Sequence, residues 1–406
     1  MTGAVLAVGS ELLRPGRRDT NAEWLIARLL DYGIETSWRA AVDDDVSRIS
    51  ALARQALEHA DVVVLTGGLG PTEDDRTREA LAAALNAPLE RDALMADRIV
   101  AMFTARGRIA SPRQALQADR PRGASFIDNP LGSAPGILFE REGRLLAALP
   151  GVPAEMKAMF EATLAPRLAA LASGALARTT LRVAGRPESY VDDLLRDLYD
   201  TAGTDTTILA SAGSVELLVT ARGGNAEARL AALVAEMRAR LGNDCFGADG
   251  DTLQSVAGRL LLAQGATVAT AESCTAGLLG AALTDVPGSS AWFRGGLLCY
   301  ADALKVSLAL VPEQLLKAHG AVSEDVARAM AAGARRQCTA DFGIGITGIA
   351  GPGGGTEAKP VGTVHIALAD DREGRAVKLD WPGDRALIRR RAVNVALDLL
   401  RRRLAG

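Results

Sequence analysis

The sequence is poor in the side chains on which much hydrolytic and metal chemistry depends. Its 406 residues include three histidines and four cysteines, all far apart, with no C-x-x-C pair. This spacing argues against a zinc site and against a disulfide framework. No apolar run reaches the roughly 18 residues that a membrane span needs, and residues 4–8 are typical of a strand rather than of a signal peptide. We therefore expect a cytoplasmic protein without membrane contact.

The sequence also lacks an excess of charge of either sign. Charged residues make up 23% of the chain, and the formal net charge is -3. Because acids and bases are interspersed, there is no field to attract a polyanion, and we do not expect nucleic-acid binding. The exceptions are two arginine runs, residues 389–391 and 401–403, on one predicted C-terminal helix. We expect them to form a solvated helix end, where cations suit the helix dipole.

Apolar residues, in contrast, are abundant, at 48% of the chain. A chain of 406 residues exceeds the size at which a single core keeps growing, so several domains are expected. We predict an α/β domain over residues 1–165, a small α+β domain over 166–250 and a second α/β domain over 251–406.

The first domain alternates apolar runs with amphipathic stretches, as a parallel sheet with crossover helices requires. We expect strands at residues 4–8 and 61–66, and helices at 21–31, 47–59, 76–86 and 91–106. Thr20 or Asn21 could cap the first helix.

The middle domain has the order strand, helix, strand, strand, helix. We predict strands at residues 181–183, 207–210 and 215–221, and helices at 189–199 and 226–241. This order resembles a KH-like module, but no GXXG loop joins two helices, so RNA binding does not follow. We expect a role in spacing and dimer contact, with residues 247–251 as a polar linker.

In the third domain, a predicted strand at residues 267–271 is followed by Glu272-Ser273-Cys274-Thr275-Ala276-Gly277 and a helix rich in small residues. Amide groups at a helix N-terminus can hold a phosphate or an oxyanion, which makes Ser273 a candidate nucleophile. The simpler alternative is that Ser273 or Thr275 only caps the helix. Cys274 is a rival nucleophile, because a thiol at a helix start can have a lowered pKa.

A serine nucleophile needs a group that takes its proton, and histidine is scarce. A lysine or a tyrosine can serve. Tyr300 ends a predicted strand at residues 297–300, and Lys305 follows five residues later. The alternative is that Tyr300 packs at a strand end and Lys305 is a surface amine.

A glycine-dense segment, residues 343–355, begins as a buried strand and breaks into a loop whose amides could approach a phosphate. No Gly-Lys-Ser/Thr follows, which disfavours hydrolysis of nucleoside triphosphates. Beyond the next strand, predicted at residues 361–368, Arg385 precedes the last helix. It could bind a phosphate in bidentate fashion or pair with groups of that helix.

These residues resemble the CinA family, whose C-terminal domain is similar to nicotinamide mononucleotide amidohydrolases. Six segments occur in the family's order: residues 271–277 (AESCTAG), 288–293 (GSSAWF), 320–324 (GAVSE), 345–352 (GITGIAGP), 359–364 (KPVGTV) and 383–385 (GDR). The resemblance implies conversion of nicotinamide mononucleotide to nicotinic acid mononucleotide and ammonia, without a cofactor. It implies Ser273 as nucleophile, assisted by Tyr300 and Lys305. The candidate substrate-binding residues of this domain are Thr275, Gly277, Thr347, Gly348 and Arg385.

A second glycine motif, Gly67-Gly68-Leu69-Gly70-Pro71-Thr72-Glu73-Asp74-Asp75, follows a buried strand and precedes a helix. Open α/β sheets bind ligands at this position. The glycines allow a phosphate to approach, and Asp74 and Asp75 could hold a divalent metal. Alternatively, the acids only cap and charge the first helical turn. The candidate binding residues here are Gly67, Gly68, Gly70, Thr72 and Asn129.

This motif resembles the molybdopterin-binding fold found at the N-terminus of CinA proteins. The resemblance implies an ADP-ribose pyrophosphatase that needs a divalent metal and potassium. One departure is the basic stretch at residues 14–18 (RPGRR), where the family usually has acidic, glycine-containing sequence. We expect a homodimer acting on small nucleotides. The alternative is a non-catalytic pterin- or nucleotide-binding protein, or a competence-associated interaction protein.

Overall fold

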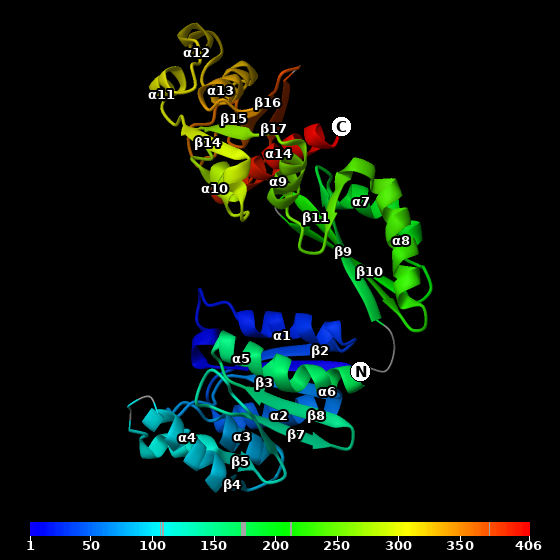
Figure 1. Cartoon of the computed structure of the whole chain (residues 1–406). Helices are drawn as coiled ribbons and strands as arrows, with labels where there is room; N and C mark the ends of the chain where they lie inside the picture. Colours follow the sequence, from blue (N-terminus) through cyan, green and yellow to red (C-terminus); the bar gives the residue numbers. More distant parts are fainter. Residues whose placement is uncertain (106, 108, 172–175, 212, 373) are drawn as a thin grey trace. The chain divides into compact units, whose positions relative to one another are not determined.

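The computed structural model describes residues 1–105, 107, 109–171, 176–211, 213–372 and 374–406. The chain divides into two compact units, Met1–Leu176 and Ala177–Gly406 (Figure 1). The first unit is an α/β domain, and the second contains a small α+β domain followed by another α/β domain. The predicted fold classes are therefore confirmed.

The sheet of the first unit has the strand order β2-β1-β3-β8-β7-β6. β2, β1, β3 and β8 are parallel, and β7 and β6 complete the sheet as antiparallel strands. β3, with the sequence VVVLT, is buried throughout, as expected for a parallel strand with helices on both faces. The strands are β1 (Thr2–Val8), β2 (Glu35–Val42), β3 (Val62–Thr66), β6 (Ser125–Ile127), β7 (Gly136–Arg141) and β8 (Arg144–Leu149).

Helices cover both faces of this sheet, and each face has its own apolar cluster. The side chain of Asp19, rather than Thr20 or Asn21, caps α1 by accepting the Ala22 amide at 2.9 Å. The helix predicted over residues 91–106 is α4, and Arg106 lies outside the described residues. The remaining elements are η1 (Ser10–Leu13), α1 (Thr20–Asp31), α2 (Val46–His59), α3 (Thr77–Ala84), β4 (Leu89–Arg91), α4 (Ala93–Ala105), η2 (Pro112–Ala118), β5 (Asp119–Pro121), α5 (Pro153–Met159), the π-helix η3 (Phe160–Leu164) and α6 (Ala165–Leu171).

The α+β domain has a sheet of order β10-β11-β9-β12 that packs against two helices. The predicted linker was wrong in its first part, because Gly247 and Ala248 belong to β12 and pair with β9. The elements are β9 (Leu176–Ala184), α7 (Glu188–Leu195), η4 (Arg196–Leu198), β10 (Thr204–Ser211), β11 (Ser214–Arg222), α8 (Ala226–Leu241), η5 (Gly242–Asp244) and β12 (Cys245–Ala248).

The last domain has a sheet of order β14-β13-β15-β16-β17, of which the first three strands are parallel. α9, α10 and α14 cover one face around an apolar cluster, and α13 packs on the other (Figure 1). The elements are α9 (Leu253–Gln264), β13 (Val268–Glu272), α10 (Leu278–Thr284), η6 (Ser289–Ala291), β14 (Phe293–Leu298), α11 (Asp302–Ser307), α12 (Glu313–His319), α13 (Glu324–Gln337), β15 (Phe342–Gly348), β16 (Thr363–Ala369), β17 (Arg375–Asp380) and α14 (Arg385–Ala405).

The arginine run at residues 401–403 is not the solvated helix end that we predicted. Arg401 is 4% exposed and is paired with Asp398 at 2.6 Å. Arg402 bridges Asp398 and Asp244, each at 2.7 Å, so α14 is tied to the α+β domain. Burial alone would raise the pKa of Asp244, but the guanidinium groups of Arg186 and Arg402 lower it. The paired carboxylates, which the run itself does not reveal, offset the cost of burying these guanidinium groups.

Among the described residues, no helix is both long and apolar enough to cross a membrane. All four cysteines are free thiols.

Candidate functional sites

Three of the predicted C-terminal motifs meet at one edge of the sheet. β13 lies between β14 and β15, and its last residue, Glu272, pairs with Leu298 on one side and Ile346 on the other. Ser273 donates its amide to the carbonyl of Ile346 at 2.9 Å. Because these parallel strands end together, the segments that carry Ser273 and Tyr300 leave the sheet beside the last residues of β15, which include Thr347.

The turn at residues 273–277 corrects the predicted helix start. α10 begins only at Leu278, with Gly277 as its N-cap, so neither Ser273 nor Thr275 caps it. The turn is closed by the amide of Ala276, which donates to the carbonyl of Ser273 at 3.1 Å. Ala276 has a φ of 49°, and Gly277 has a φ of 92°. A left-handed alanine costs about 1–2 kcal/mol, so other contacts must hold this turn.

Glu272 supplies those contacts and was missed at the sequence level. Its carboxylate is 1% exposed and accepts the amides of Gly277 (3.0 Å), Leu279 (3.1 Å) and Gly280 (2.8 Å). The amides that we expected to bind a phosphate at this helix start are therefore occupied. The available signal was an acid directly before a predicted helix, where carboxylates are stabilised.

Ser273 is 7% exposed, and its hydroxyl makes no hydrogen bond with any described residue. Lys305 is not the surface amine of the alternative interpretation, because it is 2% exposed. Its Nζ donates to the carbonyl of Tyr300 at 3.2 Å and pairs with Asp302 at 3.1 Å. β14 ends two residues before Tyr300, whose side chain is 60% exposed. The structure thus joins Lys305 to the backbone of Tyr300 but leaves Ser273 without a hydrogen bond to either.

Cys274 is buried, and this burial raises its pKa to about 11. The nearby Arg389 and Arg385 oppose the shift without reversing it. The side chain is therefore a thiol at neutral pH, whereas nucleophilic attack needs the thiolate. This environment disfavours Cys274 as the nucleophile.

Two arginines of α14 approach the same edge. Arg385 donates to the carbonyl of Gly351 at 2.8 Å and to the hydroxyl of Tyr300 at 3.2 Å. Arg389, four residues later and thus on the same helix face, donates to the carbonyl of Thr275 at 2.7 Å. Arg389 Nε and the hydroxyl of Thr275 are buried and have no partner within the described part of the chain. Sequence reasoning missed Arg389, although its spacing from Arg385 was a signal.

Thr347 and Gly348 have contacts that serve the loops. The hydroxyl of Thr347, 1% exposed, donates to the carbonyl of Ala321 at 2.8 Å. A Cβ at Gly348 would lie 2.7 Å from Cγ2 of Val364, so glycine is required there by packing. Both residues lie at the carboxyl end of β15, where we expected the site, but the hydroxyl of Thr347 is hydrogen-bonded to the loop that precedes α13.

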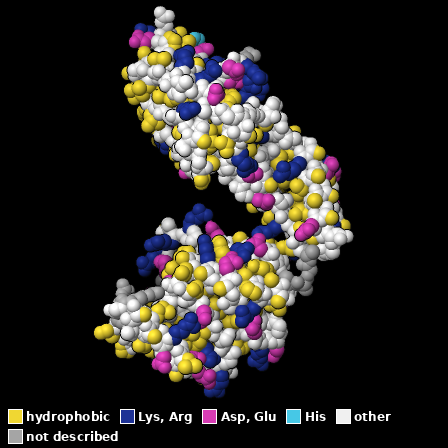
Figure 2. Space-filling view, viewed as in Figure 1, with side chains coloured by type: hydrophobic (Ala, Val, Ile, Leu, Met, Phe, Trp, Pro, Cys, Tyr) yellow, Lys and Arg dark blue, Asp and Glu magenta, His cyan; other side chains and the backbone are white. Residues whose placement is uncertain are grey.

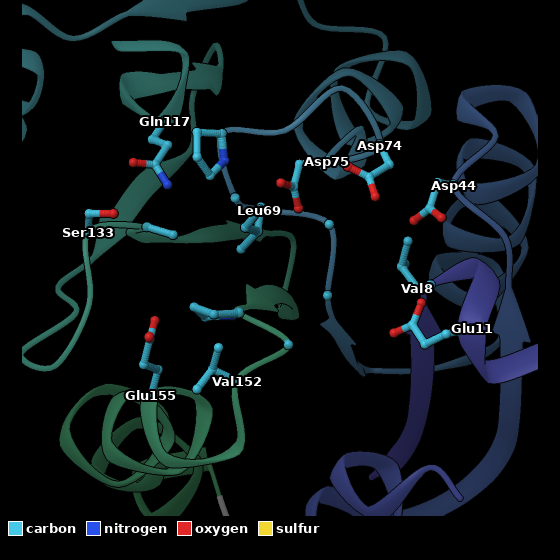
Figure 3. A pocket seen from close by; sticks show the side chains of 18 residues that line it. Val8, Glu11, Asp44, Leu69, Asp74, Asp75, Gln117, Ser133, Val152 and Glu155 are labelled. Carbon is cyan, nitrogen blue, oxygen red and sulfur yellow. The ribbon is translucent and has the colours of Figure 1, made fainter. Parts of the chain in front are cut away.

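The N-terminal glycine motif forms one wall of a pocket of about 380 Å³ (Figure 3). Gly67 and Gly68 have φ values of 105° and 67°, and a Cβ at Gly67 would collide with the carbonyl oxygen of Val8. Gly67, Gly68, Gly70, Asp74 and Asp75 all line the pocket, whereas Thr72 does not.

A buried arginine, missed at the sequence level, holds this loop. Arg78 is 4% exposed and donates to the carbonyls of Leu69 (2.6 Å), Gly70 (2.9 Å) and Asp75 (3.2 Å). Burial lowers its pKa from the ordinary value, but a guanidinium remains charged at neutral pH. Arg78 therefore fixes the carbonyl side of the loop.

Carboxylates enter the pocket from several elements. Figure 3 shows Glu11, Asp44 and Asp74 along one side and Glu155 on the other. Thr72 organises the motif, because its amide donates to Asp75 at 2.8 Å and its hydroxyl contacts both Asp74 and Asp75. The hydroxyl of Thr72 lowers the pKa of Asp74. The acids lie in a turn before α3 and do not cap it.

Carboxylate oxygens are the ligands that Mg²⁺ prefers. However, no three Asp, Glu, His or Cys side chains of the described residues converge on one metal position. Asp74 and Asp75 thus suit a divalent ion in chemistry but do not complete its shell. Such an ion would need phosphate oxygens and water as further ligands, as Mg²⁺ commonly does.

Asn129 does not line this pocket. Its Nδ2 donates to the carbonyl of Ala134 at 2.9 Å and to Glu155 at 2.6 Å, and its Oδ1 accepts the amide of Gly132 at 2.8 Å. With these contacts, Asn129 braces the loop over residues 129–134 and orients Glu155.

The basic stretch at residues 14–18 is exposed and lies between η1 and α1. Figure 2 shows Lys and Arg side chains gathered on the part of the first unit where η1 leads into α1. Arg18 makes a 3.5 Å ion pair with Glu23, which is also largely exposed.

Comparison with known proteins identifies each part of the chain. Residues 250–404 match the family model for the CinA C-terminal domain, residues 178–247 that for the damage-inducible protein CinA KH domain, and residues 4–170 that for a probable molybdopterin binding domain. The solved structure of "the protein CinA with unknown function" from Thermoplasma acidophilum is 34% identical and covers 41% of this chain and 97% of its own, with a TM-score of 0.38.

Full-length relatives cover all three parts. A CinA-like protein of Parasynechococcus marenigrum is 44% identical over 98% of this chain and 97% of its own length. A putative competence-damage inducible protein of Symbiobacterium thermophilum is 44% identical over 100% of this chain and 99% of its own length. With similarity of this extent along its whole length, the chain belongs to the CinA family.

Proposed function

We propose that the C-terminal domain is an amidohydrolase that releases ammonia from nicotinamide mononucleotide, with Ser273 as nucleophile. The observation that carries this proposal is a nearly buried serine whose hydroxyl is free, on a turn with a left-handed alanine, at the same strand edge as the buried amine of Lys305. Nucleophilic serines need such freedom, whereas a helix-capping serine has its hydroxyl engaged.

In the first step, Oγ of Ser273 attacks the carboxamide carbon while its proton passes to Tyr300 or Lys305. The C–N bond then breaks, and the amide nitrogen takes up a proton and leaves as ammonia. Water attacks the resulting ester, so that the carboxylate product forms and Ser273 regains its proton. The amide of Thr275 has no acceptor within the described residues and is our candidate donor to the oxyanion.

The nucleotide phosphate would bind to the arginines of α14. Arg385 and Arg389 place two guanidinium groups on one helix face beside the turn, and Arg389 Nε and the hydroxyl of Thr275 are without partners in the part of the chain that the structure describes. Guanidinium groups are well suited to phosphate. These arginines take the place of the phosphate site that we expected at the start of α10, because Glu272 occupies the amides there.

The test uses the full chain with nicotinamide mononucleotide and a chelator, with ammonia as the readout. We expect release by the wild type, a loss of about a thousandfold or more in Ser273→Ala, and no loss in Ser290→Ala, a control at an exposed serine. Absence of release by the wild type would reject the amidase and favour a non-catalytic binding or interaction protein.

We further propose that the N-terminal pocket hydrolyses ADP-ribose with a divalent ion and potassium. The supporting observation is a glycine loop whose carbonyls are held by Arg78, beside Glu11, Asp44 and Asp74. A divalent ion bound there by Asp74 and a neighbouring carboxylate would neutralise phosphate charge and activate water. Hydrolysis of ADP-ribose with Mg²⁺ and potassium, abolished by a chelator, is expected. Binding without cleavage would instead indicate a pterin- or nucleotide-binding role.

A further inference from the structure

Glu272 is a buried carboxylate to which the proposed mechanism gives no chemical step. We propose that Glu272 is a positioning residue: its carboxylate binds the first amides of α10 and thereby keeps the hydroxyl of Ser273 free to act as a nucleophile. The inference rests on the proposed function where it concerns the amide substrate. The reactivity of Ser273 itself can be measured separately.

The contacts of Glu272 use both of its carboxylate oxygens as acceptors. Oε2 accepts the amides of Gly277 and Leu279 at 3.0 and 3.1 Å, and Oε1 accepts that of Gly280 at 2.8 Å. The hydroxyl of Thr270 adds a longer contact of 3.4 Å to Oε1. Two carboxylate oxygens offer about four acceptor positions, whereas glutamine has one acceptor oxygen and an NH₂ group that would face an amide donor.

Without this carboxylate, another acceptor would have to satisfy the start of α10. A helix start leaves its first amides unpaired, and serine and threonine hydroxyls are preferred partners for them. Ser273 and Thr275 are the nearest hydroxyls in the sequence, and their position favours a cap by pattern alone. Glu272 takes this role instead, which explains how a serine so close to a helix start keeps its hydroxyl unpaired.

The same carboxylate also stabilises the shape of the turn. Ala276 and Gly277 both have positive φ, and a helical continuation through residues 273–277 would remove these values. Because Glu272 is fixed between β14 and β15, its carboxylate binds α10 from a rigid base. The carbonyl of Glu272 also accepts the amide of Cys299 at 2.8 Å, which couples this base to the strand edge that carries Tyr300.

The experiment compares Glu272→Gln with Asp341→Asn in the full chain. Asp341 is a matched control, because its carboxylate accepts the amide and hydroxyl of Thr267, both at 2.8 Å, just before the other end of β13. We measure kcat and KM for ammonia release from nicotinamide mononucleotide, and the rate at which a fluorophosphonate modifies Ser273, by mass spectrometry.

We expect Glu272→Gln to lower kcat about a hundredfold with KM changed less than about threefold, because a misplaced nucleophile affects the reaction more than binding. Fluorophosphonate modification of Ser273 should slow in parallel. Asp341→Asn should leave both rates unchanged. Glu272→Asp, which keeps the charge but is shorter, should recover part of kcat, and it replaces the glutamine variant if that one does not fold.

The outcomes separate the two proposals. Unchanged kcat and unchanged modification in folded Glu272→Gln would overturn the inference. If the wild type releases no ammonia but Ser273 is modified, and more slowly in Glu272→Gln, the positioning role stands and the amidase proposal fails. If Ser273 of the wild type neither reacts nor supports release, both fail.

Discussion

The loop at residues 67–70 and the turn at residues 273–277 occupy the same place in two α/β domains. Each follows the carboxyl end of a buried parallel strand and leads toward a helix. Each is held from within by one buried ionisable side chain, which is an arginine in the first domain and a glutamate in the last. Arg78 binds the carbonyls of the first segment, whereas Glu272 binds the amides after the second.

The sign of the internal ion decides which groups remain for a ligand. Where Arg78 occupies carbonyls, the glycines of the loop and the side chains of Asp74 and Asp75 border the pocket, and this combination suits phosphate and metal chemistry. Where Glu272 occupies amides, the hydroxyl of Ser273 is left free. One topology can thus support two chemistries through the choice of one buried charge, and the following experiments test this comparison.

The largest effect is expected from Arg78→Met. This change leaves three carbonyls of the loop without their donor, and we expect it to lower the free energy of unfolding of the first unit by about 3 kcal/mol or more. Thermal unfolding followed by calorimetry measures this loss. Arg76→Met is the control, because Arg76 is 46% exposed and its 3.4 Å pair with Glu79 should contribute less than about 1 kcal/mol. Equal losses in both variants would contradict the role of Arg78.

The next effect separates the two sites. Asp74→Asn removes the charge of a carboxylate that borders the pocket, and we expect it to lower ADP-ribose hydrolysis by on the order of a hundredfold. The hydrogen bond from Thr72 lowers the pKa of Asp74. The carboxylate therefore stays ionised through the pH range in which an ordinary aspartate takes up a proton, and it loses its charge only at lower pH. Hydrolysis should therefore not decline through Asp74 between pH 5 and 7. Ammonia release should be unchanged, and a parallel loss of both activities would argue against two independent sites.

A smaller effect is expected from Arg389→Gln. The guanidinium of Arg389 donates to the carbonyl of Thr275, and a charged hydrogen bond of this kind contributes about 1.5–3 kcal/mol. We expect kcat/KM for ammonia release to fall at least about tenfold. Arg390→Gln is the matched control, since Arg390 is exposed and makes no hydrogen bond or ion pair within the described residues. A similar loss in the control would show that only the net charge of α14 matters.

Sequence patterns predicted the helices and strands well, but they predicted the roles of the buried side chains Arg78 and Glu272 poorly. The apolar run of β3 and the glycines after it were sufficient to place the first pocket, because periodicity and turn preference are local properties. Arg78 and Glu272 could not be assigned in this way, since their partners are backbone groups that come together only after folding. Asn129 shows the converse, because a polar residue in a promising loop proved to brace the chain rather than line the pocket.

The predicted start of α10 was wrong for the same reason. The pattern after Ser273 favours an immediate helix start, yet α10 begins at Leu278 because the carboxylate of Glu272 satisfies its amides from the preceding strand. The arginine run at residues 401–403 looked solvated because two of its partners, Asp244 and Asp370, are distant in sequence, and only Asp398 lies within the same helix. The partners of buried charged side chains, both near and distant in sequence, are therefore the part of this fold that sequence patterns did not reveal.

The smallest effect is expected at the residue next to the nucleophile. Cys274→Ala removes a buried thiol whose pKa is raised to about 11 by burial, so little thiolate is lost at neutral pH. We expect ammonia release to stay within about threefold of the wild type, in contrast to the loss in Ser273→Ala. Alkylation of Cys274 by iodoacetamide, followed by mass spectrometry, should rise as the pH approaches 11 rather than near the ordinary thiol value of about 8.5. Loss of release in Cys274→Ala together with rapid alkylation at pH 7 would make Cys274 the nucleophile, and the free hydroxyl of Ser273 would then need another explanation.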